Sequence, residues 1–300
     1  KPGLLLEPGA SRAGEIEIAD LGLNIEGSRS SLITDQDLAP VLSQRTTTDH
    51  KWTNAVRLIA ASPGMIGAAQ LAASGALRAG AGMVVVSSPT INLQSNDMPP
   101  EAVQRKITAA TLVPEVLKDL DRFAALLIGP GLGTDPETIA MTAELIERSP
   151  IPTVVDADGL TAVATHPTCV IRSASTTVLT PHDGEFEKLT GSPPALDRCA
   201  AVRSAAKNSA VLLKGPTTLV SDTNGDLIFV RNANQRLATA GTGDVLTGII
   251  GAVIRNTPIH LAAAAAAHWH GQAAQLAQPD MTASDLPLLL QSARSEMLTK

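Results

Sequence analysis

A carboxylate at the mouth of a glycine-rich loop is the feature of this sequence with the clearest chemical meaning. In the stretch ATAGTGDVLTGIIGAVI, residues 238–254, Gly241 and Gly243 precede Asp244, and an apolar helical pattern follows at once. Backbone N–H groups at the start of such a helix bind phosphate well. A carboxylate beside a phosphate repels it, unless the carboxylate takes a proton from an attacking hydroxyl. Asp244 is therefore predicted to be the general base of a phosphoryl transfer, with a helix cap as the simpler alternative.

A second stretch, KGPTT at residues 214–218, offers groups that complement a phosphate. Lys214 carries a compact positive charge, and Gly215, Thr217 and Thr218 offer hydrogen-bond donors. A surface turn between two strands is the alternative interpretation. The sequence contains no GxxxxGK[ST] motif, so this stretch is not a P-loop.

Histidine and acidic side chains occupy two further loops. PHDGEFEKL places His182 and Glu185 directly after an apolar run. His182 is expected to contact a ring or hydroxyl of the second substrate, and Glu185 is expected to hold magnesium through water. The alternative is a turn that leads into a helix, whose dipole favours Glu185 in the first turn. DADGL carries Asp156 and Asp158, which are interpreted as a metal-binding or capping pair.

Short β-branched runs alternate with longer helical patterns along the chain. The predicted strands are Met83–Val86, Ala124–Ile128, Thr153–Val155, Thr177–Leu179, Ala210–Leu213, Thr217–Val220 and Leu227–Val230. The predicted helices are Gly64–Ala79, Pro136–Arg148, Ala195–Asn208, Asp244–Arg255 and Ile259–Gln278. This alternation is typical of an α/β fold with a mostly parallel central sheet and helices on both faces. The NG pair in SDTNGDLIFV predicts one antiparallel hairpin, and residues 24–48 are interpreted as an irregular linker.

The reactive loops all follow predicted strands. ALLI is followed by GPGLG, TVV by DADGL, TVLT by PHDGEF and AVLL by KGPTT. Ligands of open α/β sheets bind beyond the carboxyl ends of the strands. These loops are therefore expected to converge at one edge of the sheet, where residues 241–244 can join them.

Composition limits the class of protein. The chain has 300 residues and a net charge of −6, with no basic block, so nucleic acid and anionic membrane are not expected as partners. No apolar run approaches the roughly 20 residues of a membrane span, and a cytoplasmic protein is expected. Cys169 and Cys199 lack CxxC spacing and are predicted to be buried thiols in a reducing compartment. His268 and His270 show no zinc pattern and are interpreted as structural.

Taken together, these motifs resemble those of the ADP/ATP-dependent NAD(P)H-hydrate dehydratases of the ribokinase-like superfamily. The resemblance is carried by GMIGAAQLAASGALRAGAGMVVVSSP, IGPGLG, VVDADGL, LTPHDGEF, LLKGPTTLV, ATAGTGDVLTGIIGAVI and AAAHWHGQAAQLA, and it spans residues 45–295 in order. It implies a ribokinase-like three-layer αβα sandwich. It also implies nucleotide-dependent dehydration of hydrated NADH and NADPH, in which the ring hydroxyl is phosphorylated and phosphate is then lost.

The resemblance implies roles for particular residues. The hydrated dinucleotide would be bound by Ala68, Gly131, His182 and Asp244. The nucleotide would be bound by Lys214, Gly215, Pro216, Thr217, Thr218, Gly241, Thr242 and Gly243. Mg²⁺ is expected with the nucleotide, and ADP is the expected phosphoryl donor, with ATP as the alternative. The family's usual HPGE reads HDGE here, so Asp183 stands where a proline is usual. The usual SHK reads DHK, and RLIAASPGM lacks the usual double glycine.

The resemblance also implies a division of the chain. Residues 1–25 resemble the tail of an NAD(P)H-hydrate epimerase domain, residues 26–44 are the expected linker, and residues 45–300 are the expected dehydratase domain. An epimerase domain, fused or separate, and further copies of the chain are the expected protein partners. Two other functions compete with the dehydratase. One is a kinase of the same superfamily that acts on a vitamin precursor or sugar, and the other is a non-catalytic nucleotide-binding protein.

Overall fold

The computed structural model describes residues 1–17, 19, 22, 25, 27–42, 46–172, 176–231 and 234–299. In this part of the chain, one ten-stranded sheet has the order β1-β10-β9-β8-β7-β6-β5-β2-β3-β4. The strands are β1 (Ser30–Leu32), β2 (Ala55–Ile59), β3 (Met83–Ser87), β4 (Ala102–Gln104), β5 (Ala125–Ile128), β6 (Thr153–Val155), β7 (Thr177–Leu179), β8 (Ala210–Leu213), β9 (Thr218–Ser221) and β10 (Leu227–Val230). Neighbouring strands are parallel, except that β9 runs antiparallel to both β8 and β10. The mostly parallel sheet and the predicted hairpin are therefore confirmed.

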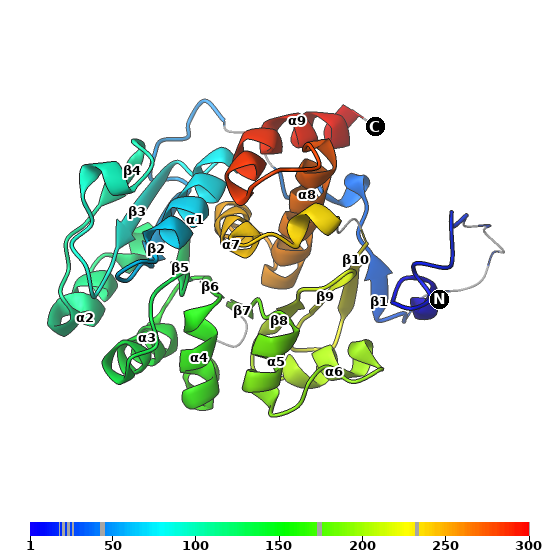
Figure 1. The fold of residues 1–300 in the computed structure, drawn as a ribbon, viewed down its shortest axis with the longest axis horizontal. Helices are drawn as coiled ribbons and strands as arrows, with labels where there is room; N and C mark the ends of the chain where they lie inside the picture. The colour runs from blue at the N-terminus through cyan, green and yellow to red at the C-terminus, as the bar shows by residue number, and fades with distance from the viewer. Residues whose placement is uncertain are drawn as a thin grey trace.

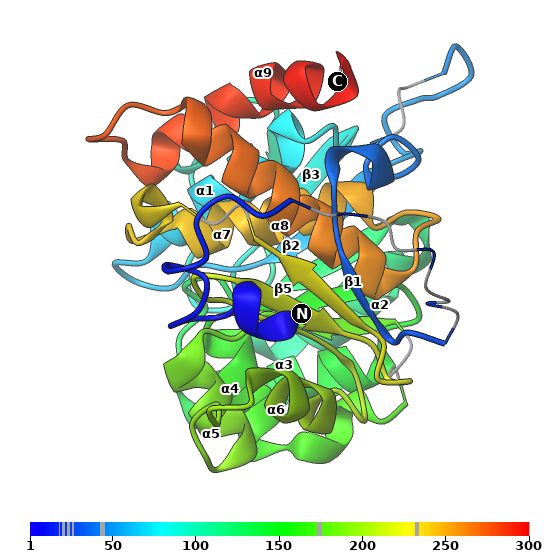
Figure 2. The ribbon, with the colours of Figure 1, turned by 90° about the vertical axis from the view of Figure 1, so that its right-hand side faces the viewer.

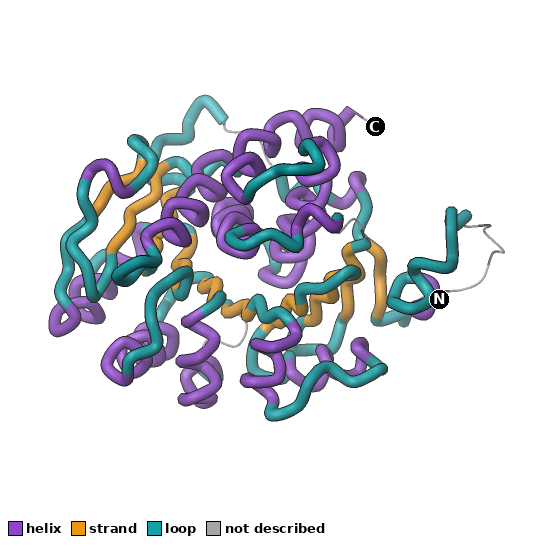
Figure 3. Tube along the Cα trace, viewed as in Figure 1, coloured by secondary structure: helices purple, strands orange, loops and turns teal. Residues whose placement is uncertain are grey.

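Helices cover both faces of the sheet, as Figures 1 and 3 show. The helices are α1 (Ile66–Arg78), α2 (Leu112–Leu117), α3 (Pro136–Arg148), α4 (Asp158–Thr165), α5 (Asp183–Thr190), α6 (Arg198–Ala205), α7 (Thr242–Val253), α8 (Ile259–Leu276) and α9 (Leu286–Thr299). In Figure 1, α1 and α7–α9 lie above the sheet and α2–α6 lie below it. The fold is thus the predicted three-layer αβα sandwich.

The hydrophobic core has two halves because successive side chains of a strand point to opposite faces of the sheet. Val56 and Leu58 of β2 point into the cluster that packs under α1 and α7–α9. Their neighbours Ala55 and Ile59 belong to the other cluster, which packs against α2–α6. Successive strand side chains point to opposite faces, so a strand buried on both faces is mostly apolar along its whole length. This is the reason that runs such as VVV and ALLI predicted strands correctly.

Helices α1 and α7 approach one another closely through glycine. A Cβ on Gly75 would lie 2.5 Å from the Val245 carbonyl oxygen, and one on Gly248 would lie 2.1 Å from the Ala72 oxygen. No side chain fits such gaps, so glycine at these two positions sets the distance between the helices. Since α7 begins at the glycine loop, its packing on α1 positions Asp244 relative to the sheet.

Several predictions about the elements need correction. Strand β1 and the buried residues Leu38, Val41 and Leu42 lie inside the stretch interpreted as an irregular linker, because β10 offers a sheet edge to residues 30–32. Residues 24, 26 and 43–45 of that stretch lie outside the described residues. The sequence patterns also did not predict β2, β4, α2, α4, α5 and α9. Most of these are short or have only one buried apolar residue per turn, which leaves a weak periodic signal.

The first helical turn of α7 also differs from the expectation. The helix begins at Thr242, two residues before the predicted start, and Gly241 is its N-cap with φ of +91°. This backbone angle favours glycine, and a Cβ at Gly241 would also displace the Leu71 side chain, whose Cδ1 lies 2.4 Å from the Cβ position. Asp244 is consequently the third residue of the helix rather than its cap.

Candidate active site

A buried ion pair joins two of the loops that follow strands. Lys214 Nζ lies 2.9 Å from Asp156 Oδ1, although 58 residues separate them in the sequence. Thr180 Oγ1 donates to Asp156 Oδ1 at 2.7 Å, and Thr247 Oγ1 of α7 donates to Asp156 Oδ2 at 2.8 Å. Burial alone would raise the pKa of Asp156, but the charge of Lys214 and these hydrogen bonds hold it below the ordinary value. Asp156 is thus an ionised group held by Lys214 and two hydroxyls, and it is not the cap of α4, whose N-cap is Ala157.

Lys214 is held by several negative charges. Burial would lower its pKa, but Asp156, Glu185 and Asp244 keep it above the ordinary value. Its Nζ lies 3.6 Å from Glu185 Oε2, and it lies 3.4 Å from the position of a Cβ on Gly243. The ammonium group therefore stands fixed and charged at the start of α7, where a phosphate would lie against the backbone N–H groups.

The surroundings of Asp244 shift its pKa upwards, in the opposite direction to that of Asp156. Burial and the negative charge of Asp156 raise its pKa from the ordinary 3.8 to about 7, with Asp158 and Glu185 adding to the shift and Lys214 opposing it. A general base works best when its pKa lies near the working pH. The two carboxylates thus differ in character, because donors surround Asp156 whereas other negative charges surround Asp244. This contrast supports the predicted role of Asp244.

Two cavities adjoin at the start of α7. The larger has a volume of about 640 Å³ and is lined by every residue of KGPTT. The smaller has a volume of about 370 Å³ and is lined by Asp156, His182 and Asp244. The residues common to both are Lys214, Leu237, Ala238, Thr242 and Gly243. All the predicted nucleotide-binding residues line the larger cavity except Gly241, which lines the smaller one.

The loop before α5 is organised by its own side chains. His182 Nδ1 accepts hydrogen bonds from the backbone N–H groups of Gly184, at 3.0 Å, and Glu185, at 3.3 Å. Glu185 Oε2 accepts one from the His182 N–H at 2.8 Å, which completes a capping box. Both residues therefore cap α5, whose first turn contains Glu185 as the alternative interpretation expected, while His182 also lines the smaller cavity. Among the described residues, no group of three or more metal-ligating side chains comes together.

Asp183 forms an ion pair that offsets its charge. Arg198 at the start of α6 donates two hydrogen bonds to the Asp183 carboxylate, at 2.8 and 2.9 Å. A Cβ on Gly215 would lie 3.0 Å from the Arg198 Nη2 atom, so the same guanidinium also packs on the KGPTT loop. Arg198 thus offsets the charge of the acid that replaces the usual proline, and Asp183 lines neither cavity.

Ala68 and Gly131 lie together beside this site. A Cβ on Gly131, whose φ is +58°, would lie 3.1 Å from the Ala68 side chain. Ala68 lies in α1, after β2, and Gly131 lies in the loop after β5. These two strands are neighbours at the point where the strand order reverses, which is the topological switch point of the sheet. Neither residue lines either of the two cavities. The Gly133 N–H, in the same loop as Gly131, donates to Asp158 Oδ2 at 2.8 Å and so links this loop to the DADGL loop.

Thr180, Thr247 and His270 of this site were not predicted from the sequence. Thr247 follows Asp244 by three residues, so a polar residue on the same face of an otherwise apolar helix was the available signal. His270 was interpreted as structural, but it lines the larger cavity, and its Nε2 has no hydrogen-bond partner among the described residues. Burial lowers the pKa of His270 to about 4, so the ring is neutral. His268 is bound elsewhere, with Nε2 2.7 Å from Asp35 Oδ1.

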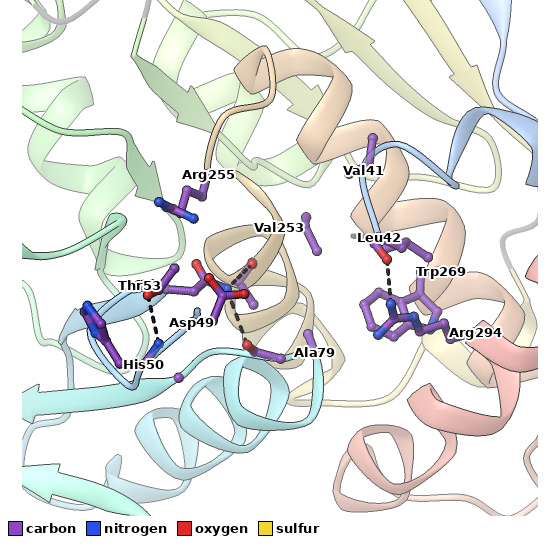
Figure 4. Close-up of a pocket in the computed structure, with 14 residues that line it drawn as sticks. Val41, Leu42, Asp49, His50, Thr53, Ala79, Val253, Arg255, Trp269 and Arg294 are labelled. Carbon is purple, nitrogen blue, oxygen red and sulfur yellow. Dashed lines mark hydrogen bonds between the residues drawn. The ribbon is translucent and has the colours of Figure 1, made fainter. Parts of the chain in front are cut away.

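A third cavity, of about 230 Å³, lies at the other edge of the sheet, where strands β2 and β3 begin (Figure 4). Arg294 of α9 donates to the Leu42 carbonyl oxygen beside it. Asn54 Nδ2 donates to the carbonyl oxygens of Gly80, at 3.4 Å, and Ala252, at 2.7 Å. These contacts join the C-terminal ends of α1 and α7 to the chain before β2, so they stabilise the fold rather than form part of the active site.

The sheet order and the helices on both of its faces are those of a ribokinase-like fold. A ribokinase-like superfamily protein from Enterococcus faecalis superposes with a TM-score of 0.77 over 92% of this chain and 98% of its own, at 22% identity. The chain belongs to the NAD(P)H-hydrate dehydratase family, whose sequence profile matches residues 56–295. The predicted family is therefore confirmed.

Two relatives extend the comparison. The bifunctional NAD(P)H-hydrate repair enzyme Nnr of Moorella thermoacetica is 35% identical over 330 residues. The match covers the whole of this chain, which spans only 62% of the length of that enzyme. The ADP/ATP-dependent NAD(P)H-hydrate dehydratase of Bacillus subtilis, co-crystallised with ATP and Mg²⁺, is 27% identical with a TM-score of 0.72. That superposition covers 89% of this chain and 98% of the Bacillus protein.

Proposed function

We propose that the chain restores hydrated NADH and NADPH by transferring the terminal phosphoryl group of ADP or ATP to the ring hydroxyl. The observation that carries this mechanism is the pair of adjoining cavities, with Lys214 and Gly243 between them and Asp244 in the smaller one. The nucleotide would occupy the larger cavity and the hydrated dinucleotide the smaller. Such an arrangement brings a donor and an acceptor together across a fixed positive charge, which is what phosphoryl transfer requires.

In the first step, Asp244 takes the proton of the ring hydroxyl while the hydroxyl oxygen attacks the terminal phosphorus. The bond between phosphorus and the nucleotide's bridging oxygen breaks, and the shortened nucleotide leaves. Lys214 and the N–H groups at the start of α7 stabilise the charge that develops on the phosphoryl oxygens. Because the pKa of Asp244 is about 7, a large fraction of it is ionised and ready to accept the proton at neutral pH.

In the second step, the lone pair of the ring nitrogen expels phosphate, and loss of a proton from the neighbouring carbon restores the double bond. Phosphate leaves far more readily than hydroxide, which is the chemical purpose of the phosphorylation. Ala68, Gly131 and His182 are proposed to bind the dinucleotide. Of these, His182 already faces the smaller cavity.

Magnesium would be held mainly by the nucleotide's phosphate oxygens and, through water, by Glu185. The carboxylate chemistry fits this ion, and the Glu185 side chain is 16% exposed beside Lys214. The ion would neutralise charge on the phosphates. The capping box holds the Glu185 side chain in place.

The domain division, the protein partners and the cellular location of the chain are also proposals. We assign residues 45–300 to the dehydratase domain and residues 1–25 to the tail of an epimerase domain, with further copies of the chain as partners. The length of the bifunctional Moorella relative, of which this chain covers 62%, supports an additional domain. A cytoplasmic location is supported by two buried cysteines that are not joined in a disulfide. Among the described residues, no helix is both long and apolar enough to cross a bilayer.

The experiment uses hydrated NADPH, Mg²⁺ and either ADP or ATP, with reduced nicotinamide followed by its near-ultraviolet absorbance. Recovery of absorbance with one nucleotide and release of inorganic phosphate, both lost in Asp244→Ala, are the expected results and identify the donor. A stable phosphorylated product would indicate a small-molecule kinase instead. No reaction by folded protein that binds nucleotide would refute the mechanism.

A further inference from the structure

A segment outside the matched family region lines the proposed nucleotide cavity. The family profile begins at residue 56, yet Glu7, Ala10 and Ser11 are among the residues that line the 640 Å³ cavity. In Figure 2 this N-terminal segment lies in front of the β1 end of the sheet. The cavity walls are therefore built from two parts of the chain that lie about 200 residues apart in the sequence.

Contacts at several points fix the segment to the domain. Thr217 Oγ1, of the KGPTT loop, donates a hydrogen bond to the Leu5 carbonyl oxygen. The side chains of Leu5 and Leu6 pack against the core cluster on the α2–α6 side of the sheet. Further along, Arg231 Nη2 lies 3.5 Å from the Gly14 oxygen. The segment is thus held where it borders the cavity and does not fill it.

The position of Lys214 orients a nucleotide in this cavity. Lys214 and Gly243 stand at the boundary with the smaller cavity, so the terminal phosphate belongs there. Thr217, which contacts Leu5, lines only the larger cavity, as do Glu7, Ala10 and Ser11. The N-terminal segment therefore borders the part of the cavity farther from the reacting phosphate, where the ribose and the base would lie.

Glu7 has the chemistry to recognise a ribose. An ionised carboxylate only accepts hydrogen bonds, and adjacent ribose hydroxyls are a pair of donors. Glu7 would not suit a phosphate, which it would repel. Its Oε2 lies 3.4 Å from the Ser11 N–H, a long contact that constrains the carboxylate only weakly.

We propose that residues 5–11 are part of the nucleotide site, with Glu7 accepting hydrogen bonds from the ribose hydroxyls of ADP or ATP. Leu5 and Leu6 act as positioning residues, because they hold the segment against the domain. This proposal rests on the proposed function, since it assigns the nucleotide to the larger cavity. It adds a binding element that lies outside the matched region of the family profile.

The first test measures binding of Mg·ADP and Mg·ATP to the full chain by calorimetry. Glu7→Gln is expected to raise Kd about five- to tenfold, because a charge-assisted hydrogen bond is lost. Glu15→Gln is the matched control, since Glu15 is an exposed acid of the same segment that does not line the cavity. It is expected to change Kd less than twofold.

Deoxynucleotides test whether Glu7 acts through the ribose. Wild-type protein should bind ADP more tightly than 2′-deoxy-ADP or 3′-deoxy-ADP, and Glu7→Gln should abolish that preference. A merely structural role would weaken all three ligands equally. Equal loss for the three ligands, or no loss at all, would overturn the assignment of Glu7.

A second variant tests the segment as a whole. Leu5→Asp with Leu6→Asp should detach it and raise the nucleotide Kd more than about tenfold, because two partly buried apolar contacts are lost. Leu4→Asp is the control, since Leu4 is 42% exposed. Unchanged binding would overturn the proposal, and tighter binding would also do so, since it would show that the segment competes with the nucleotide.

Wild-type protein that binds neither nucleotide would refute the proposed function as well. Nucleotide binding without dehydration would refute the proposed function alone.

Discussion

Replacing Asp244 by asparagine separates the catalytic and the energetic consequences of burying this carboxylate. The variant keeps the shape of the side chain but cannot accept the substrate's proton, so dehydration of hydrated NADPH should fall by at least about 10²-fold. In wild-type protein, kcat/KM should fall about tenfold for each pH unit below 7, because protonated Asp244 is inactive. The residual activity of Asp244→Asn should lack this acid limb.

The same substitution should stabilise the folded protein at high pH. The folded state keeps a proton on Asp244 up to a pKa of about 7, whereas the ordinary value is 3.8. Ionisation therefore costs folding free energy that grows between about pH 4 and pH 7 and is complete above pH 7. At about 1.36 kcal/mol per pKa unit the cost reaches about 4 kcal/mol. Asp244 is only partly buried, so solvent screening reduces this to about 2–3 kcal/mol.

Thermal unfolding at two pH values measures this effect. At pH 8, Asp244→Asn should raise Tm by about 4–6 °C, whereas at pH 4.5 the gain should be less than about 2 °C. Asp280→Asn removes an exposed acid and should change Tm by less than about 1 °C at either pH. An equal gain at both pH values would show that charge burial is not its cause, and a loss at pH 8 would refute the electrostatic reasoning.

Three further predictions test the structure around the site. Thr247→Val should lower the free energy of unfolding by about 1.5–3 kcal/mol in urea titrations, because buried Asp156 loses a hydrogen-bond donor at 2.8 Å. The control Thr165→Val, on the exposed side of α4, should lower it by less than about 0.5 kcal/mol. Gly248→Ala should destabilise by about 2–3 kcal/mol, because its Cβ would lie 2.1 Å from a backbone oxygen of α1. Gly67→Ala, with nothing within 4 Å, should stabilise by about 0.5 kcal/mol, so equal effects of the two alanines would contradict the packing argument. His270→Leu should raise the KM for the nucleotide about three- to tenfold in steady-state kinetics, because the unpartnered Nε2 of His270 is lost from a residue that lines the larger cavity. An unchanged KM would indicate that His270 has only a structural role.

Much of the fold could be predicted because the relevant signals are local. Strands buried on both faces are mostly apolar, and four predicted strands, β6, β7, β8 and β10, have the observed bounds. The hairpin followed from NG, whose glycine adopts a φ of +87°. Strand β1 could not be predicted, because the short run SSL is exposed and becomes a strand only by pairing with β10.

The site was predicted unevenly for a related reason. The residue types that do chemistry, Asp244, Lys214 and His182, stood out in glycine-rich loops that follow strands. The sequence could not show that Asp156 pairs with Lys214 or that Asp183 pairs with Arg198, because a pairing depends on which strands and helices become neighbours. Nor could it show that Glu7 borders the same cavity as Thr217, 210 positions away.

The sequence by itself thus determined the class of fold, the family and the reactive groups, because periodicity, glycine loops and charged residues are written in consecutive positions. Only the tertiary structure decided the electrostatic character of each group. Asp156 and Asp244 are the same residue type, but three donors keep the pKa of Asp156 low, whereas burial and neighbouring carboxylates raise that of Asp244 to about 7. Those surroundings come from β7, β8 and α7 packing together, and no linear pattern contains them.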